Sequence, residues 1–145
     1  MKNTLLNHPN GGVIFGHVVG VSNPHFTIEE APIVLKFGIE KGQGSFGAEH
    51  IWHRHRSEIT PMGYRSLVQV PEFVAAIVRP HSKVLLDFTR SGSSKSGSSK
   101  LIALRNNLGM AILQLQPLQD GTRAYSVVTA YRQCSPRGQE VTVIR

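Results

Sequence analysis

The chain of 145 residues contains a single cysteine, Cys134. One cysteine cannot form an internal disulfide, and it cannot supply the several thiolates of a cysteine-rich metal site. The sequence also lacks a stretch of about 20 apolar residues, the length that a membrane-spanning helix requires. Residues 1–10 lack the apolar stretch of a signal peptide. We therefore expect a globular chain without a membrane segment, although a piece of a larger exported protein would have the same features.

Acidic and aromatic residues are also scarce. Asp and Glu number 9 against 16 Lys and Arg, and aromatic residues make up 7% of the chain. Residues 1–40 hold two lysines and three glutamates, a net charge of −1. Since the whole chain has a net charge of +7, the remaining residues carry a net charge of +8. A basic body of this kind favours a polyanionic partner, with nucleic acid first and an acidic protein second.

Two stretches carry the apolar spacing of helices. The first covers residues 45–59, with Ser45 in the position of an N-cap and Pro61 just beyond the end. The second covers residues 70–78, with Pro71 at its first position. Both precede the main group of strands, which indicates an α+β domain rather than an alternating α/β fold.

Strand patterns dominate the second half of the chain. They cover residues 83–90, 100–105, 110–116 and 124–132, with turn signals between them. Four consecutive strands with short connections indicate an antiparallel meander. We therefore expect N-terminal helices packed on a curved antiparallel sheet of about four strands. Weaker strand patterns cover residues 13–21, 33–37 and 140–145.

These patterns divide the chain into three parts. Residues 1–30 are expected to form an N-terminal tail or linker region that includes one candidate strand. Residues 31–132 form the main domain, and residues 133–145 a C-terminal tail or edge strand. Within the main domain, residues 91–100 repeat Ser-Gly-Ser-Ser-Lys twice. That composition cannot build a core and is typical of a flexible loop.

The densest group of reactive side chains lies in the first helix. Residues 47–56 contain three of the seven histidines and two arginines. At 100° per residue, His50, His53 and Arg54 share the polar face, whereas His55 falls among the apolar residues. His55 is then either a core histidine or part of a face packed over a cleft. Histidine exchanges protons near neutral pH and arginine binds phosphate, so the group indicates phosphodiester chemistry.

The last strand of the meander adds two polar groups. Residues two apart share a face of a strand, so Tyr125, Val127, Thr129 and Tyr131 are expected to point the same way. If that face meets the histidine helix, a hydroxyl and a phenol lie beside the imidazoles and the guanidinium. The two segments would then form one site from residues far apart in the chain.

The pattern Gly47-x-x-His50-Ile51-x-x-Arg54-His55, followed by a closing strand Val127-Val128-Thr129-Ala130-Tyr131, resembles the BECR-type nucleases. These are the barnase-like (barnase, EndoU, colicin and RelE) nuclease domains found in phages, in colicin-type tRNases and at the tips of contact-dependent inhibition toxins. The resemblance covers about residues 30–132. It implies two or three helices on a curved sheet of about four strands, and a metal-independent ribonuclease.

The resemblance also implies a partner and a set of site residues. The substrate would be tRNA or another RNA, cleaved in the bacterial cytoplasm by a toxin that an acidic cognate immunity protein neutralises. The catalytic positions carried over by motif match are His50, Arg54, His55, Thr129 and Tyr131. Further RNA contacts are expected from His53, Lys100 and Arg105. No metal and no cofactor are expected.

RNA cleavage of this kind uses the ribose 2′-hydroxyl as the nucleophile. The protein must supply a base, an acid and a positive charge for the phosphoryl oxygens. We expect His50 to be base or acid, with His55 or His53 as its counterpart, and Arg54 to hold the phosphate. On the strand, the threonine would donate a hydrogen bond to the same phosphate. The tyrosine would stack on a base or place a proton.

Three other interpretations remain open. A zinc site could use His50, His53 and His55, but the third lies on another helix face and no HExxH motif exists. A non-catalytic RNA-binding module would need only basic charge and exposed aromatic residues. In an interaction domain of a phage or exported protein, the histidine cluster would be incidental.

Overall fold

Strands form most of the secondary structure. The computed structural model describes residues 1–86, 101–132 and 139–145. Seven strands belong to one main sheet: β1 (Gly16–Val18), β4 (Ala31–Val34), β5 (Lys83–Leu86), β6 (Leu101–Arg105), β7 (Met110–Pro117), β8 (Arg123–Tyr131) and β9 (Gln139–Val143). A separate two-stranded ribbon consists of β2 (Val21–Ser22) and β3 (Thr27–Ile28).

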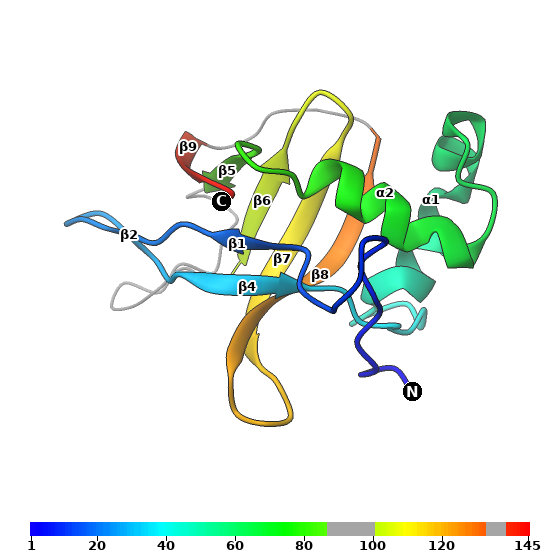
Figure 1. The fold of residues 1–145 in the computed structure, drawn as a ribbon, viewed down its shortest axis with the longest axis horizontal. Helices are drawn as coiled ribbons and strands as arrows, with labels where there is room; N and C mark the ends of the chain where they lie inside the picture. Colours follow the sequence, from blue (N-terminus) through cyan, green and yellow to red (C-terminus); the bar gives the residue numbers. More distant parts are fainter. Residues whose placement is uncertain (87–100, 133–138) are drawn as a thin grey trace.

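The main sheet curls into a nearly closed barrel. Its strand order is β1-β4-β8-β7-β6-β5-β9, and all neighbours are antiparallel except β4 and β8. The two edge strands meet, because Val18 forms a bridge with Ile144 and the Arg145 N–H donates to the His17 carbonyl at 2.9 Å. Figure 1 shows the C-terminus beside β1 for this reason.

The expected fold class is therefore wrong. We expected N-terminal helices on an antiparallel sheet of about four strands. The structure has a mixed sheet of seven strands, and two of these strands, β1 and β4, precede both helices in the chain. The antiparallel run β5 to β8 is present, but β1, β4 and β9 extend it on both sides. The parallel pairing of β4 with β8 joins Ile33 to Tyr125, and nothing in the local sequence marks so distant a partner.

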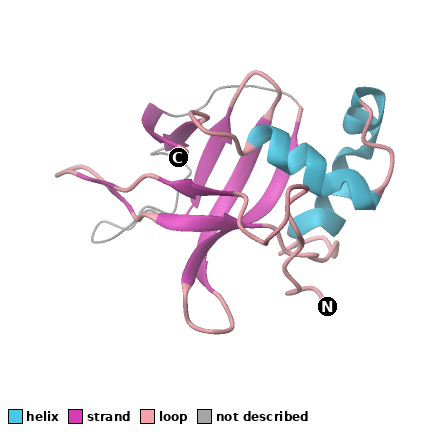
Figure 2. Ribbon diagram, in the orientation of Figure 1, coloured by secondary structure: helices cyan, strands magenta, loops and turns pink. Residues whose placement is uncertain are grey.

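Two α-helices connect β4 to β5. α1 covers Gly47–Ile59 and α2 covers Val70–Ile77, each within two residues of the expected span. Short 3-10 turns, Thr60–Met62 and Leu67–Gln69, link them. Both helices lie on the same side of the molecule, toward β8 (Figure 2). Among the described residues, no helix combines the length and the apolar character needed to cross a membrane.

The hydrophobic core lies between the curled sheet and the helices. Phe73, Val74 and Ile77 of α2 are buried, as are Ile51 and Ile59 of α1. The segments before α1 contribute as well, because buried residues in their strands and next to them join the same cluster. These residues are Phe15, Val18, Ile28, Ile33 and Leu35.

α1 occupies an edge that β4 leaves free. β4 pairs with β8 at only two positions, so the second half of β8 has no strand on that side, and α1 packs against β8. The helix starts on the segment after β4, where the Ala48 and Glu49 N–H groups donate to the Lys36 and Phe37 carbonyls. These carbonyls take the role expected of Ser45, which does not cap the helix.

A bulge changes the direction of side chains within β8. Ile112 pairs with Thr129 but its neighbour Leu113 pairs with Val127, so Val128 is the extra residue. Beyond the bulge the alternation is inverted. The expectation that all four odd-numbered residues share one face is therefore wrong: Val127 faces the core, whereas Thr129 and Tyr131 face the other side.

Candidate functional site

The structure brings two histidines of α1 and one tyrosine of β8 together. The ring centres of His50 and His55 are 6.3 Å apart, and those of His55 and Tyr131 are 5.4 Å apart. The two histidine side chains are 16% and 20% exposed, so both still reach solvent. His55, which the helical wheel placed among the apolar residues, therefore lies at the boundary between core and surface, over the end of β8.

Each of these two histidines is held by a carboxylate at the same ring nitrogen. His50 Nδ1 lies 3.3 Å from Glu40 Oε2, and His55 Nδ1 lies 2.8 Å from Glu58 Oε2. A carboxylate can only accept, so Nδ1 carries a proton in both rings. Among the described residues neither Nε2 atom has a hydrogen-bond partner. Both histidines therefore present a free Nε2 for proton exchange.

Glu40 is itself fixed by the loop between β4 and α1. Ile39 and Phe46 exchange two backbone hydrogen bonds, of 2.9 and 3.1 Å, which close the loop. The Ser45 hydroxyl then donates to Glu40 Oε1 at 2.7 Å. This hydrogen bond, followed by His50 and the positive charge of Arg54, holds the pKa of Glu40 below its ordinary value. Glu40 is therefore ionised at neutral pH.

Arg54 and Thr129 are the two remaining residues of the expected catalytic set. Arg54 is exposed, one helical turn beyond His50, and forms no ion pair within the described part of the chain. Thr129 lies on the same face of β8 as Tyr131, and its hydroxyl is buried without a hydrogen-bond partner in the structure. The exposed guanidinium is suited to an incoming anion, whereas the threonine hydroxyl lacks both a hydrogen-bond partner and solvent contact.

The expected RNA-contact residues fall in three different places. His53 is exposed, and its Nε2, not its Nδ1, lies 3.0 Å from Glu49. Arg105 lies in the row that pairs through Met110 to Tyr131, two strands away, and forms an ion pair with Glu140 at 3.2 Å. Lys100 lies outside the described residues.

Three residues of the site were missed at the sequence level. Glu58 lies three residues after His55 on the same helix, a spacing at which side chains meet, so it could have been found. Glu40 and Ser45 belong to a glycine-rich loop, and only the folding of that loop onto α1 brings them to His50.

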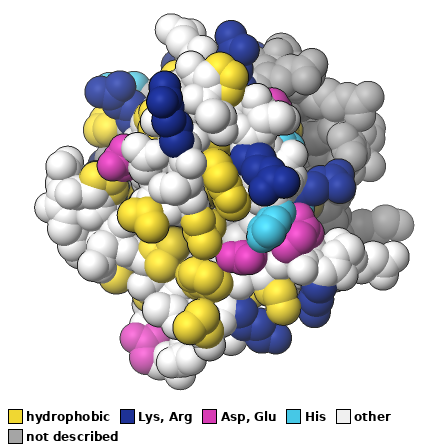
Figure 3. All heavy atoms as spheres, turned by 90° about the vertical axis from the view of Figure 1, so that its right-hand side faces the viewer, with side chains coloured by type: hydrophobic (Ala, Val, Ile, Leu, Met, Phe, Trp, Pro, Cys, Tyr) yellow, Lys and Arg dark blue, Asp and Glu magenta, His cyan; other side chains and the backbone are white. Residues whose placement is uncertain are grey.

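The three helix histidines do not converge on a common point. Each one contacts a different glutamate, and no group of three or more His, Cys, Asp or Glu in the described ranges is arranged to hold a metal ion. Instead, the imidazole rings of His50 and His55 lie side by side, with ring centres 6.3 Å apart. Viewed from the helix side, the surface shows a histidine between acidic side chains, with Lys and Arg side chains nearby (Figure 3).

Comparison with known proteins adds no family to this geometry. No protein-family model matches the chain, and no curated protein sequence matches it. The site consists of two carboxylate-held histidines, a tyrosine, and an arginine and a threonine hydroxyl that have no partner among the described residues.

Proposed function

We propose that this protein is a metal-independent endoribonuclease that uses the 2′-hydroxyl of its substrate as the nucleophile. One observation carries the proposal: two histidines, 6.3 Å apart between ring centres, each have Nδ1 on a carboxylate and Nε2 free. This is the arrangement that a base and an acid need on opposite sides of one phosphate. The +7 net charge supports a polyanionic substrate.

The reaction follows from the two free Nε2 atoms. One neutral imidazole removes the proton of the 2′-hydroxyl, and the 2′-oxygen forms a bond to phosphorus. The bond from phosphorus to the 5′-oxygen breaks, and the second histidine, protonated, gives its proton to that leaving oxygen. The products are a 2′,3′-cyclic phosphate and a 5′-hydroxyl. Each proton transfer contributes roughly 10²–10⁴-fold to the rate.

The remaining groups act on charge and position. Arg54 is placed to hold the non-bridging phosphate oxygens through its fork of donors. The Thr129 hydroxyl is assigned to the same phosphate, and because this hydroxyl is shielded from solvent in the free protein, its hydrogen bond requires the covering side chains to move on substrate binding. Tyr131, in ring contact with His55, stacks on a base or orients the ring that it touches. These groups supply charge stabilisation without a metal or a cofactor.

The proposal extends to the biological role that the sequence resemblance implies. A nuclease of this type would act as a toxin on tRNA or another RNA in the bacterial cytoplasm. An acidic immunity protein would neutralise it, and the excess of 16 Lys and Arg over 9 Asp and Glu supports a partner of that charge. Growth of cells that make the chain without such a partner tests this role.

Incubation with total RNA in EDTA tests the reaction itself. We expect cleavage to persist in the chelator, and mapping of the ends should find 2′,3′-cyclic phosphates and 5′-hydroxyls. RNA that is bound but stays intact would contradict the proposal and favour a binding module. Cleavage that stops in EDTA and returns with added metal would replace the two-histidine mechanism.

Replacement of Glu40 by alanine is expected to lower kcat about 10²-fold while KM changes little. The reason is that His50 loses the acceptor that fixes its Nδ1 proton and its ring orientation. ¹⁵N NMR of the ring should show a mixture of tautomers in Glu40→Ala and mainly the Nδ1-protonated form in the parent.

The same helix offers a matched control. Glu49→Ala removes the carboxylate that contacts His53, a pair of the same kind on the exposed side. This variant should keep both kcat and the His50 tautomer. Equal losses in the two variants, or an unchanged tautomer in Glu40→Ala, would show that Glu40 has no positioning role.

A further inference from the structure

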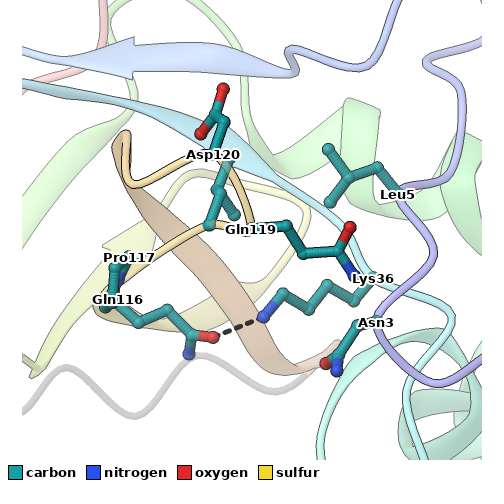
Figure 4. Close-up of a pocket in the computed structure, with 8 residues that line it drawn as sticks. Asn3, Leu5, Lys36, Gln116, Pro117, Gln119 and Asp120 are labelled. Atoms are coloured by element: carbon teal, nitrogen blue, oxygen red, sulfur yellow. Dashed lines mark hydrogen bonds between the residues drawn. The ribbon is translucent and has the colours of Figure 1, made fainter.

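A second place in the fold holds a lysine that has no acidic partner among the described residues. A pocket of about 550 Å³ lies between the N-terminal segment, the end of β7 and the turn that leads to β8. Figure 4 shows the Lys36 side chain running along the pocket to Gln116, which accepts a hydrogen bond from its ammonium group. The pocket lies at the opposite end of β7 from Met110, the residue that pairs with Tyr131.

The Lys36 side chain is largely buried, and its charge has little compensation. The residue is 7% exposed, and desolvation lowers its pKa. Its ammonium has three donors, yet Gln116 is the only hydrogen-bond acceptor found for it among the described residues. Its other neighbour is the ring of Phe46, 5.9 Å from the ring centre.

No carboxylate compensates this charge. The nearest acidic residue of the pocket, Asp120, turns its carboxylate away from Lys36 and accepts from the Thr122 N–H at 2.9 Å (Figure 4). No ion pair of Lys36 occurs within the described part of the chain. A desolvated and unpaired cation is costly, so an anion that enters the pocket gains a contact that the free protein leaves unmade.

The rest of the pocket carries side chains that recognise a planar polar ligand. Asn3 comes from the N-terminal segment and Gln119 from the turn, and both line the space beside Lys36 and Gln116. Primary amides donate and accept at once, which matches the edge of a nucleobase. The volume falls within the range of about 300–1,000 Å³ that holds small ligands.

From these observations we infer that the pocket binds a nucleotide, with Lys36 on its phosphate and the amides of Asn3, Gln116 and Gln119 on its base. The nucleotide has two sources, a free mononucleotide or one residue of a bound RNA. The second rests on the proposed ribonuclease function. Gln116 and Tyr131 face the same side of the sheet. Tyr131 pairs with Met110, which lies six residues before Gln116 on β7, a distance of about 20 Å. One RNA strand could therefore reach both places.

Titration of the full chain with adenosine 5′-monophosphate, followed by ¹H–¹⁵N NMR, tests nucleotide binding. We expect shifts at Lys36, Gln116 and Gln119, and affinity reduced about 10-fold or more in Lys36→Met, because a hydrogen bond to a charged group is lost. Lys83→Met, which removes an exposed lysine outside this pocket, should bind as the parent does. Inorganic phosphate and adenosine alone should each bind more weakly than the nucleotide.

A second variant tests the same pocket at exposed positions, where a substitution leaves the fold intact. Asn3 and Gln119 are exposed, so the variant Asn3→Ala/Gln119→Ala removes two amides without touching the core, and it should also bind the nucleotide more weakly. No shifts in the parent chain, or equal affinity for phosphate and nucleotide, would overturn the inference. Neither result depends on whether the protein cleaves RNA.

Cleavage kinetics then separate the two sources. If the nucleotide belongs to the substrate, Lys36→Met should raise KM for RNA with kcat unchanged. If KM is also unchanged while the monophosphate binds in the parent, the site takes a free nucleotide. If the parent chain does not cleave RNA, the proposed ribonuclease is contradicted, but the titration result still stands.

Discussion

Replacement of His50 by alanine is expected to slow RNA cleavage about 10²–10⁴-fold, the contribution of one proton-transfer group. The fold should persist, because the His50 side chain is partly exposed and does not belong to the hydrophobic core cluster. The measurement is single-turnover cleavage of a defined RNA at saturating enzyme, with circular dichroism and thermal unfolding as tests of folding.

Two other histidines calibrate this result. His25 is exposed in the β2–β3 ribbon, so His25→Ala should cleave at the parent rate. His53→Ala removes a histidine of the same helix whose ring faces Glu49 instead of the cluster, and we expect at most a change in KM. A folded His50→Ala protein with full activity would remove His50 from the mechanism, and a large loss in His53→Ala would place the chemistry on the other helix face.

Substitution of Gly47 by alanine is expected to lower the free energy of unfolding by about 3–5 kcal/mol. Gly47 has a φ of +82°, and an added Cβ would lie 2.6 Å from the Lys36 carbonyl oxygen and 2.8 Å from the Gly38 Cα. These atoms are backbone and cannot move aside singly. Since the same carbonyl receives the Ala48 N–H, the start of α1 would be displaced.

Gly63 supplies the control for this effect. Its φ is +107°, but an added Cβ meets no atom within 4 Å. Gly63→Ala therefore tests conformational strain without a clash, and we expect a loss of about 1–2 kcal/mol. Urea unfolding of both variants measures the difference. Similar losses in the two variants would show that the added Cβ at position 47 causes no steric cost beyond the conformational strain.

The helices were predicted well because their signals are local. Apolar spacing and the prolines at 61 and 71 locate both α1 and α2. The start of α1 was assigned to the wrong partner for a physical reason: its first N–H groups donate to the carbonyls of Lys36 and Phe37, which precede the helix in the chain by about 10 residues and carry no capping motif. Ser45 is left free to bind Glu40.

The architecture could not be predicted because it depends on long-range pairing. The short strands β1 and β4 gain their partners from β8 and from the C-terminal residues, more than 90 positions away along the chain. The bulge at Val128 is equally silent in the sequence, since valine is a common strand residue. Thr129 and Tyr131 still share a face because both lie beyond the bulge.

The candidate site was half visible from the sequence. Its histidines and Arg54 lie within one helical segment, so composition alone drew attention to them. The carboxylates differ: Glu58 follows from helix spacing, whereas Glu40 arrives through a loop closed by the Ile39–Phe46 bridge. The pocket around Lys36 combines residues 3, 36 and 116–120, and no single window of sequence contains them.

The meeting of β1 with the segment after β9 affects how a protein inhibitor could bind. An open sheet edge offers a row of free N–H and C=O groups on which a partner can add a strand. Here the two edges pair with each other through the Val18–Ile144 bridge and the hydrogen bond from the Arg145 N–H. The immunity protein proposed above would therefore not add a strand at this seam, and its acidic groups would compete with the proposed RNA substrate for the same arginines and lysines.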